Sequence, residues 1–156
     1  MLHVTVLMVG KTREGFIRQG LEFYQQRLKP LMQLSLTNVR EEKESAGLTP
    51  ETIKSKEGER LQAQTPPKSC LVALDSKGRE CTTEEFAAWL SKREELARPL
   101  AFLIGGHWGL AEAVLAAADE RLALSRLTLT HELARLILLE QLYRAMTIKM
   151  GHPYHV

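Results

Sequence analysis

Hydroxyl, imidazole, guanidinium and phenol groups gather in the last third of this chain. Residues 124 to 129 read Leu-Ser-Arg-Leu-Thr-Leu, and His131 and Arg135 follow at a spacing that puts both near the start of one helix face. Tyr154 and His155 lie in a tail that would ordinarily fray. Such groups can move a proton, stabilise negative charge and stack on an unpaired base. Taken singly, they also fit a solvated surface pair and ordinary turn or cap residues.

Three expected strands end in loops that could hold a ligand. One ends at Leu74, a second runs into a segment with three glycines at 105, 106 and 109, and a third leads into residues 124 to 129. Ligands of parallel α/β sheets collect at the carboxyl ends of the strands. The glycine segment matches neither a dinucleotide fingerprint nor a phosphate loop, so on its own it indicates only a glycine-rich turn.

The elements that would position these groups alternate between strand and helix. Periodicity, caps and breakers predict strands at 2–9, 34–39, 69–75, 100–104 and 121–124, helices at 14–28, 50–63, 82–96, 111–118 and 131–150, and a turn at 75–78. This order predicts an α/β fold, a mainly parallel sheet flanked by helices, in a single domain spanning 1–156.

Composition narrows the class of protein. With 156 residues, 44% of them hydrophobic and 26% charged, the chain is typical of one globular domain. Cys70 and Cys81 lack metal-site spacing and are expected to be packing residues. No apolar run approaches the roughly 20 residues of a membrane span and no signal peptide is evident, so we expect a cytoplasmic protein with no membrane partner.

Charge and helix patterning suggest partners. Residues 121–156 hold five basic and two acidic residues, which would attract a phosphate-bearing partner, although this content is also near average. The last helix is apolar nearly all round. A second copy of the chain could bury its spare face in a homodimer; alternatively, the helix lies centrally in its own fold.

Taken together, several motifs resemble one family over the full length of the chain. They are 103–110 (Leu-Ile-Gly-Gly-x-x-Gly-Leu), 124–129 (Leu-Ser-x-Leu-Thr-Leu), His131, Arg135, 140–145 (Glu-Gln-Leu-Tyr-Arg-Ala), 153–155 (Pro-Tyr-His), the early 9–11 turn and the 56–59 segment (Lys-Glu-Gly-Glu). The chain resembles the bacterial large-subunit ribosomal RNA pseudouridine N3-methyltransferases, minimal members of the SPOUT class. It departs from many relatives at Thr130, where they carry proline, and at His107-Trp108.

The resemblance implies a C-terminal trefoil knot, a homodimer, and S-adenosylmethionine bound in the knot. The substrate it implies is 23S rRNA, in the large subunit or the whole ribosome, methylated at N3 of a pseudouridine. The implied cofactor contacts are Leu74, Gly105, Leu124, Ser125, Arg126, Leu127, Thr128 and Leu129.

A mechanism follows as a hypothesis. Arg135, with Arg126, would stabilise the negative charge of the deprotonated imide, His131 or His155 would accept its proton, and Tyr154 would stack on or orient the base. The tail would reach the partner's cofactor, so that each site is shared between subunits. Two alternatives stay open: a non-catalytic ribosome-assembly factor that binds RNA, and a SPOUT methyltransferase that acts on tRNA.

Overall fold

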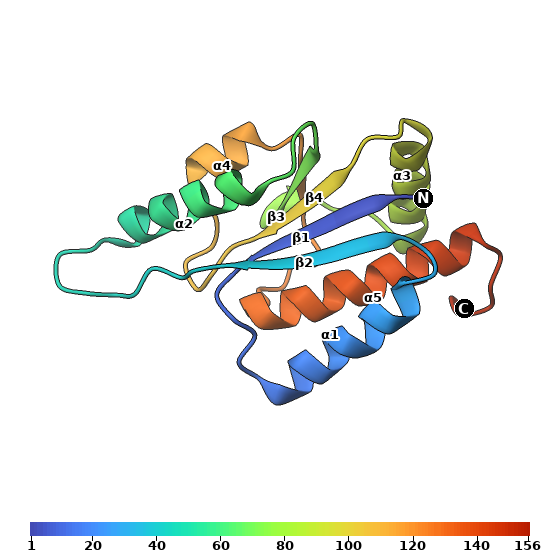
Figure 1. Ribbon diagram of the computed structural model, residues 1–156, viewed down its shortest axis with the longest axis horizontal. Coiled ribbons are helices and arrows are strands. Elements are labelled where there is room, and N and C mark those ends of the chain that lie inside the picture. The colour runs from blue at the N-terminus through green and yellow to red at the C-terminus, as the bar shows by residue number, and fades with distance from the viewer.

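The chain forms a five-stranded parallel sheet with helices on both faces (Figure 1). The computed structural model describes residues 1–156. The strands are β1 (His3–Val9), β2 (Gln33–Val39), β3 (Cys70–Arg79), β4 (Leu100–Ile104) and β5 (Glu120–Leu122), and they lie in the order β2-β1-β4-β3-β5 with every pair parallel. The predicted α/β class is confirmed. All five residues of β4 are buried, which explains its unbroken apolar sequence.

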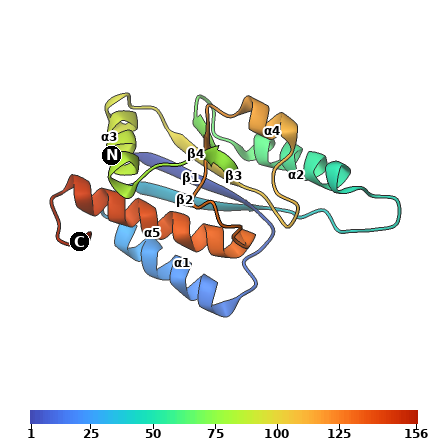
Figure 2. The same ribbon diagram turned by 180° about the vertical axis from the view of Figure 1, so that it is seen from behind.

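Five helices cover the two faces of the sheet. They are α1 (Gly15–Leu28), α2 (Pro50–Gln64), α3 (Thr83–Glu95), α4 (Glu112–Ala117) and α5 (His131–Lys149). Residues of α1, α3 and α5 form the larger core cluster with one face, and residues of α2 and α4 form the smaller cluster with the other. Figure 2 shows the same two helical layers from behind. None of the helices is both long and apolar enough to span a bilayer.

Helix α5 lies between α1 and α3 and contacts both. Leu138, Leu139 and Leu142 are fully buried against the sheet, whereas Leu133 and Ile137 are half-buried. The sequence left open whether a second copy or the chain's own fold covers this helix. The sheet, α1 and α3 cover three of its sides, and its outer side stays partly exposed.

Local signals located most helix starts correctly. The Thr82 hydroxyl accepts a hydrogen bond from the Glu85 N–H in a capping box, and the hydroxyls of Thr49 and Thr130 accept hydrogen bonds from N–H groups in the first turns of α2 and α5. The turn predicted at 75–78 is wrong, because β3 continues to Arg79, whose backbone pairs with Leu122 after an irregularity in register. That continuation depends on a strand 43 residues further on, which a local turn signal does not reveal.

Candidate active site

A cavity of about 790 Å³ opens at the end of β4, beside residues 74–77 of β3 and the segment that follows β5. Its walls contain every cofactor residue expected from the sequence except Arg126: Leu74, Gly105, Leu124, Ser125, Leu127, Thr128 and Leu129. Ile104, Leu122 and Ala134 add apolar surface, and Asp75, Ser76 and His131 add polar groups. Ten of the 23 lining residues are hydrophobic and many of the others are polar or charged, so the cavity combines apolar and polar surface, at the edge of the sheet that parallel sheets use for ligands.

A tight glycine turn forms one wall of the cavity. The Gly109 N–H donates to the Gly106 carbonyl at 3.0 Å, and Gly109 has a φ of +86°. A Cβ on Gly105 would lie 2.4 Å from the Gly109 carbonyl carbon, closer than real atoms approach. Only glycine at 105 lets the two backbone segments close this turn, so the turn's shape is set by sequence.

The segment after β5 forms the opposite wall. The Ser125 hydroxyl accepts a hydrogen bond from the Leu127 N–H at 3.0 Å, which folds the segment into a short turn. Leu127 is 75% exposed, an unusual position for a leucine that nothing in this chain covers. Arg126 points elsewhere: its guanidinium lies 3.5 Å from the Glu80 carboxylate and is largely in solvent.

His131 lies at the junction between this wall and α5. The Thr130 hydroxyl accepts a hydrogen bond from the Leu133 N–H at 3.1 Å, which fixes the first turn of α5 and with it His131, whose side chain lines the cavity. Burial lowers the pKa of His131, and the nearby charge of Arg135 lowers it further. The imidazole is therefore neutral at physiological pH and free to accept a proton.

Arg135 occupies a different environment from the one predicted. It has no exposed surface, and its guanidinium donates to the Val9 carbonyl at 2.6 Å and to the Thr12 hydroxyl at 2.8 Å. Burial lowers its pKa, opposed by the charge of Glu132. In this structure Arg135 joins α5 to the loop after β1 and is absent from the cavity wall, so direct contact with a substrate anion, as expected from the sequence, is not what its geometry supports.

Glu132 is a positioning residue that the sequence reasoning missed. Its carboxylate accepts hydrogen bonds from the backbone N–H groups of Arg13, at 3.1 Å, and Glu14, at 3.0 Å. It therefore caps α1, whose own N-cap residue, Glu14, makes no side-chain cap. Burial acts to raise the pKa of Glu132, but these hydrogen bonds outweigh it, and the net pKa is lowered. The acidic residue in the first turn of α5 was the only local signal.

The C-terminal tail packs at the far end of α5. The Tyr154 hydroxyl lies 3.4 Å from the Glu140 carboxylate, and the Arg144 guanidinium lies 4.7 Å from the centre of the Tyr154 ring. The His155 ring nitrogens lie 2.7 Å from Glu84 and 3.2 Å from Arg144. Contact with the Tyr24 hydroxyl, together with burial, raises the pKa of Tyr154 to about 12, so the phenol stays protonated.

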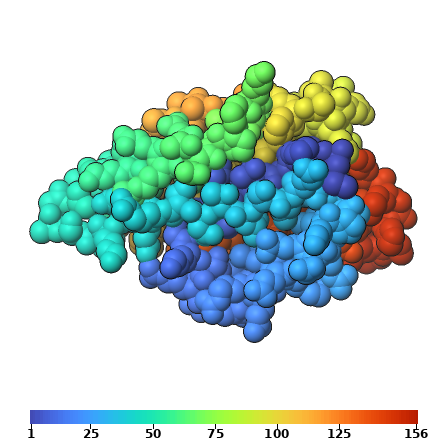
Figure 3. Space-filling model, in the orientation of Figure 1, coloured from blue at the N-terminus to red at the C-terminus, as the bar shows by residue number.

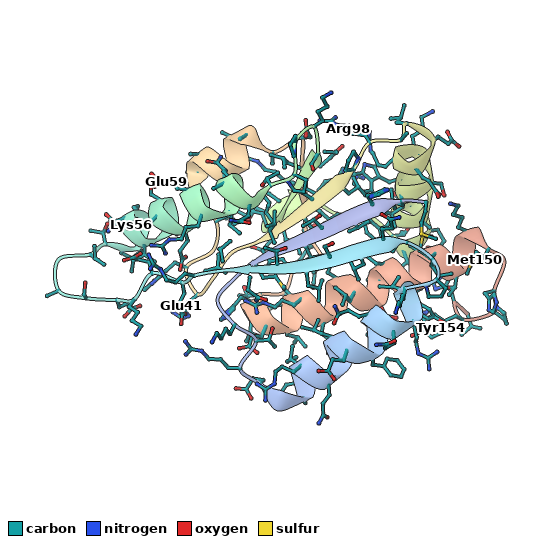
Figure 4. The ribbon with its side chains drawn as sticks, viewed as in Figure 1. Glu41, Lys56, Glu59, Arg98, Met150 and Tyr154 are labelled. Atoms are coloured by element: carbon teal, nitrogen blue, oxygen red, sulfur yellow. The ribbon has the colours of Figure 1, made fainter.

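The tail and the cavity of one chain do not meet. The tail contacts Glu140 and Arg144 of α5, which follow His131 by nine and thirteen residues, so at about 1.5 Å per residue it lies roughly 14–20 Å along the helix from His131. In Figure 4, Tyr154 and Met150 lie at the opposite end of the molecule from Glu41, which follows β2. The four catalytic residues expected from the sequence thus occupy three separate environments within one chain.

Similarity to known proteins agrees with the shape of this site. The family model described as "Predicted SPOUT methyltransferase" matches residues 2–155. The chain belongs to the SPOUT methyltransferase family. Two similar relatives, both named "Ribosomal RNA large subunit methyltransferase H", come from Carboxydothermus hydrogenoformans, at 41% identity, and Anaeromyxobacter sp. strain K, at 46%; each match covers 99% of both chains. The resemblance drawn from the motifs is confirmed.

Solved structures of SPOUT-like shape support the fold alone. A probable methyltransferase from Bordetella pertussis superposes with a TM-score of 0.57 at 14% identity, covering 93% of this chain and 96% of that one. A probable methylase family protein from Haemophilus influenzae gives 0.53 at 13% identity, covering 96% and 67%. The α/β arrangement of this SPOUT protein therefore recurs in chains whose sequences have diverged widely.

Proposed function

We propose that this SPOUT protein transfers a methyl group from S-adenosylmethionine to large-subunit ribosomal RNA, at N3 of a pseudouridine. The observation that carries the proposal is the cavity beside β3 and after β4 and β5, because seven of the eight residues expected to contact the cofactor line it. Full-length similarity to relatives named as large-subunit rRNA methyltransferases supports the choice of substrate. The C-terminal trefoil knot implied by the resemblance belongs to the same proposal.

The residues of the cavity suit S-adenosylmethionine. Leu74, Leu122 and Leu129 offer apolar surface for a purine ring, while Ser125 and Thr128 offer hydroxyls for a ribose. The turn at Gly105 brings backbone close to any ligand held there. When bound, S-adenosylmethionine supplies an electrophilic methyl group on its sulfonium. What the protein must add is alignment of the acceptor nitrogen and removal of one proton.

His131 is the candidate base on the cavity wall. Its imidazole is neutral at physiological pH because burial and Arg135 lower its pKa. A neutral imidazole near the acceptor nitrogen can take the imide proton and increase the nucleophilicity of N3. Arg135 acts indirectly: by holding the loop after β1 against α5, it fixes the end of the helix that carries His131.

Tyr154 and His155 would then act in the site of a second copy. In their own chain they pack against Glu140 and Arg144 of α5, roughly 14–20 Å along the helix from His131, and neither lines the cavity. Exposed rings on α1 favour such a homodimer: Phe16 is 64% exposed and Phe23 is 49% exposed, and the Arg27 guanidinium lies between Phe23 and the half-buried Tyr143 of α5. A second copy packed on this side would bury these rings.

Titration calorimetry with S-adenosylmethionine, followed by methylation of ribosomes from cells that lack this chain, tests the function. Mass mapping of the 23S rRNA should find one added methyl group on a pseudouridine. RNA binding without heat from the cofactor or a methylated product would favour the ribosome-assembly factor. Methylated tRNA with unmodified ribosomes would favour the tRNA enzyme.

Mixing two inactive variants tests the shared site. Gly105→Ala disrupts the cavity, and a chain truncated before Pro153 lacks the tail. If the sites are composite, a mixture of the two contains hybrid dimers with one intact site, and about a quarter of wild-type activity should return at most, as dimers form at random. No recovery, with hybrid dimers demonstrated by native mass spectrometry, would place both functions within one subunit.

A further inference from the structure

A second concave surface, of about 820 Å³, lies at the same edge of the sheet, beyond the carboxyl ends of β1 and β2. Four cationic side chains and two carboxylates line it, and we call it the basic groove: Lys11, Arg13, Arg40, Glu41, Glu42 and Lys43. The segment that follows β2 protrudes from one end of the molecule in the space-filling view (Figure 3). The cofactor site described above uses none of these residues.

Its two carboxylates are already neutralised by other partners. Glu41 forms an ion pair with Arg13, and Glu42 pairs with Arg60 of α2, with Lys56 4.0 Å away. The Arg60 hydrogen bond lowers the pKa of Glu42, which keeps it ionised and engaged. Lys11, Arg40 and Lys43 are exposed and have no carboxylate within 4.0 Å. The basic groove therefore presents three cations that form no ion pair within 4.0 Å.

Two contacts connect the basic groove to the cofactor cavity. The Trp108 indole N–H, from the glycine turn, donates to Glu44 at 3.1 Å. The buried Glu57 carboxylate accepts a hydrogen bond from the Glu42 N–H at 3.0 Å and lies behind Gly106 of the same turn. Because β1 and β4 are neighbours in the sheet, the two concave surfaces open side by side along one edge.

We propose that the basic groove binds the sugar-phosphate backbone of the RNA strand that flanks the methylated nucleotide. The identity of the bound strand rests on the proposed function. That the groove binds a polyanion rests only on the three cations beside the cavity. Phosphates spaced along a strand could meet Lys11, Arg40 and Lys43 in succession while one unpaired base enters the neighbouring cavity. Such contacts add affinity without reading sequence, so specificity would come from elsewhere.

The variant K11A/K43A tests this in the full-length protein, with K29A/K92A as the control. Lys29 and Lys92 are also exposed, lie outside both concave surfaces, and their loss changes the net charge equally. Binding of a fluorescent single-stranded oligouridylate is measured over a series of KCl concentrations. Each lost phosphate contact lowers the slope of log K against log salt by about 0.7, so K11A/K43A should lose about 1.4 and the control almost nothing.

Methylation kinetics with ribosomes provide the second readout. K11A/K43A should raise KM for ribosomes roughly tenfold at unchanged affinity for S-adenosylmethionine, because the cofactor cavity is intact. If wild type methylates ribosomes but K11A/K43A and the control behave alike in both assays, the groove does not bind RNA and the proposed methyltransferase function is unaffected. If wild type does not methylate ribosomes at all, the salt slopes still show whether the groove binds RNA. If K11A/K43A loses affinity for polyglutamate as much as for oligouridylate, the assignment of RNA as the ligand is overturned in favour of an acidic protein.

Discussion

Replacing Arg135 by alanine should destabilise the protein substantially. The substitution leaves the buried Val9 carbonyl without its donor and removes a second hydrogen bond, to Thr12. An unsatisfied buried acceptor costs about 1–3 kcal/mol, and losing the buried methylene groups of the side chain costs about 2 kcal/mol more. We therefore expect a loss of roughly 3–5 kcal/mol, or a fall in Tm of roughly 6–20 °C for a domain of this size.

Differential scanning calorimetry of Arg135→Ala beside Arg126→Ala measures this directly. Arg126 is mostly in solvent and pairs only with Glu80 at the surface, so its removal should change the stability by less than about 0.5 kcal/mol. Arg135→Ala should still bind S-adenosylmethionine at a temperature where it is folded, because the side chain does not line the cavity. An unchanged Tm with abolished methylation would refute this reasoning and restore the direct contact with substrate expected from the sequence.

Three further outcomes follow from the structure. Gly105→Ala should abolish calorimetric binding of S-adenosylmethionine, because the added Cβ would lie 2.4 Å from the Gly109 backbone; unaltered affinity would mean that the turn is not part of the cofactor site. Glu132→Gln should lower Tm at pH 7, because the pKa of Glu132 is depressed in the folded state and its ionised form stabilises the fold above an unfolded pKa of about 4.3. The difference in Tm from wild type should shrink as the pH falls through the folded pKa. A difference that stays constant with pH would contradict the capping role. Glu57→Gln should match or exceed the wild-type Tm at pH 8, because burial raises the pKa of Glu57 and its ionised form opposes folding as the pH rises. This advantage in Tm should vanish toward pH 4. A Tm below that of wild type at pH 8 would show that a buried partner stabilises the Glu57 charge.

Local features of the sequence were sufficient to predict where the helices start and which segments form the cofactor cavity. Thr82 and Thr130 each act on a backbone N–H three residues away, so their roles can be recognised within a short window. Gly105 and residues 124–129 converge because the parallel strands that precede them lie in one sheet, as the order of elements predicts, and Leu74 faces them from within β3. These parts needed no knowledge of distant contacts.

The roles of Arg135 and the tail could not be obtained in this way. The i, i+4 spacing of His131 and Arg135 correctly placed both near the start of α5, but the partner of Arg135 is a carbonyl 126 residues earlier in the chain. Tertiary packing decides which neighbour a helix face contacts. The same local sequence is therefore compatible with an arginine buried against a backbone carbonyl and with one that binds substrate. The tail was grouped with the cofactor loop because the two are close in sequence, whereas in the fold the tail packs on Glu140 and Arg144, roughly 14–20 Å along α5 from His131.

The order of strands explains why the cofactor cavity and the basic groove lie at one edge of the sheet. From β1 the chain moves to β2 on one side of the sheet, and β3, β4 and β5 are laid down on the other side. Both groups of strands point the same way, so their loops share one edge, with the cofactor cavity over β3 and β4 and the basic groove over β1 and β2. Glu57 lies behind the glycine turn and hydrogen-bonds the segment after β2, so the two halves of this edge are held in a fixed relation. If RNA binds as proposed, a strand that lies along the groove would have its next unpaired base beside the cavity.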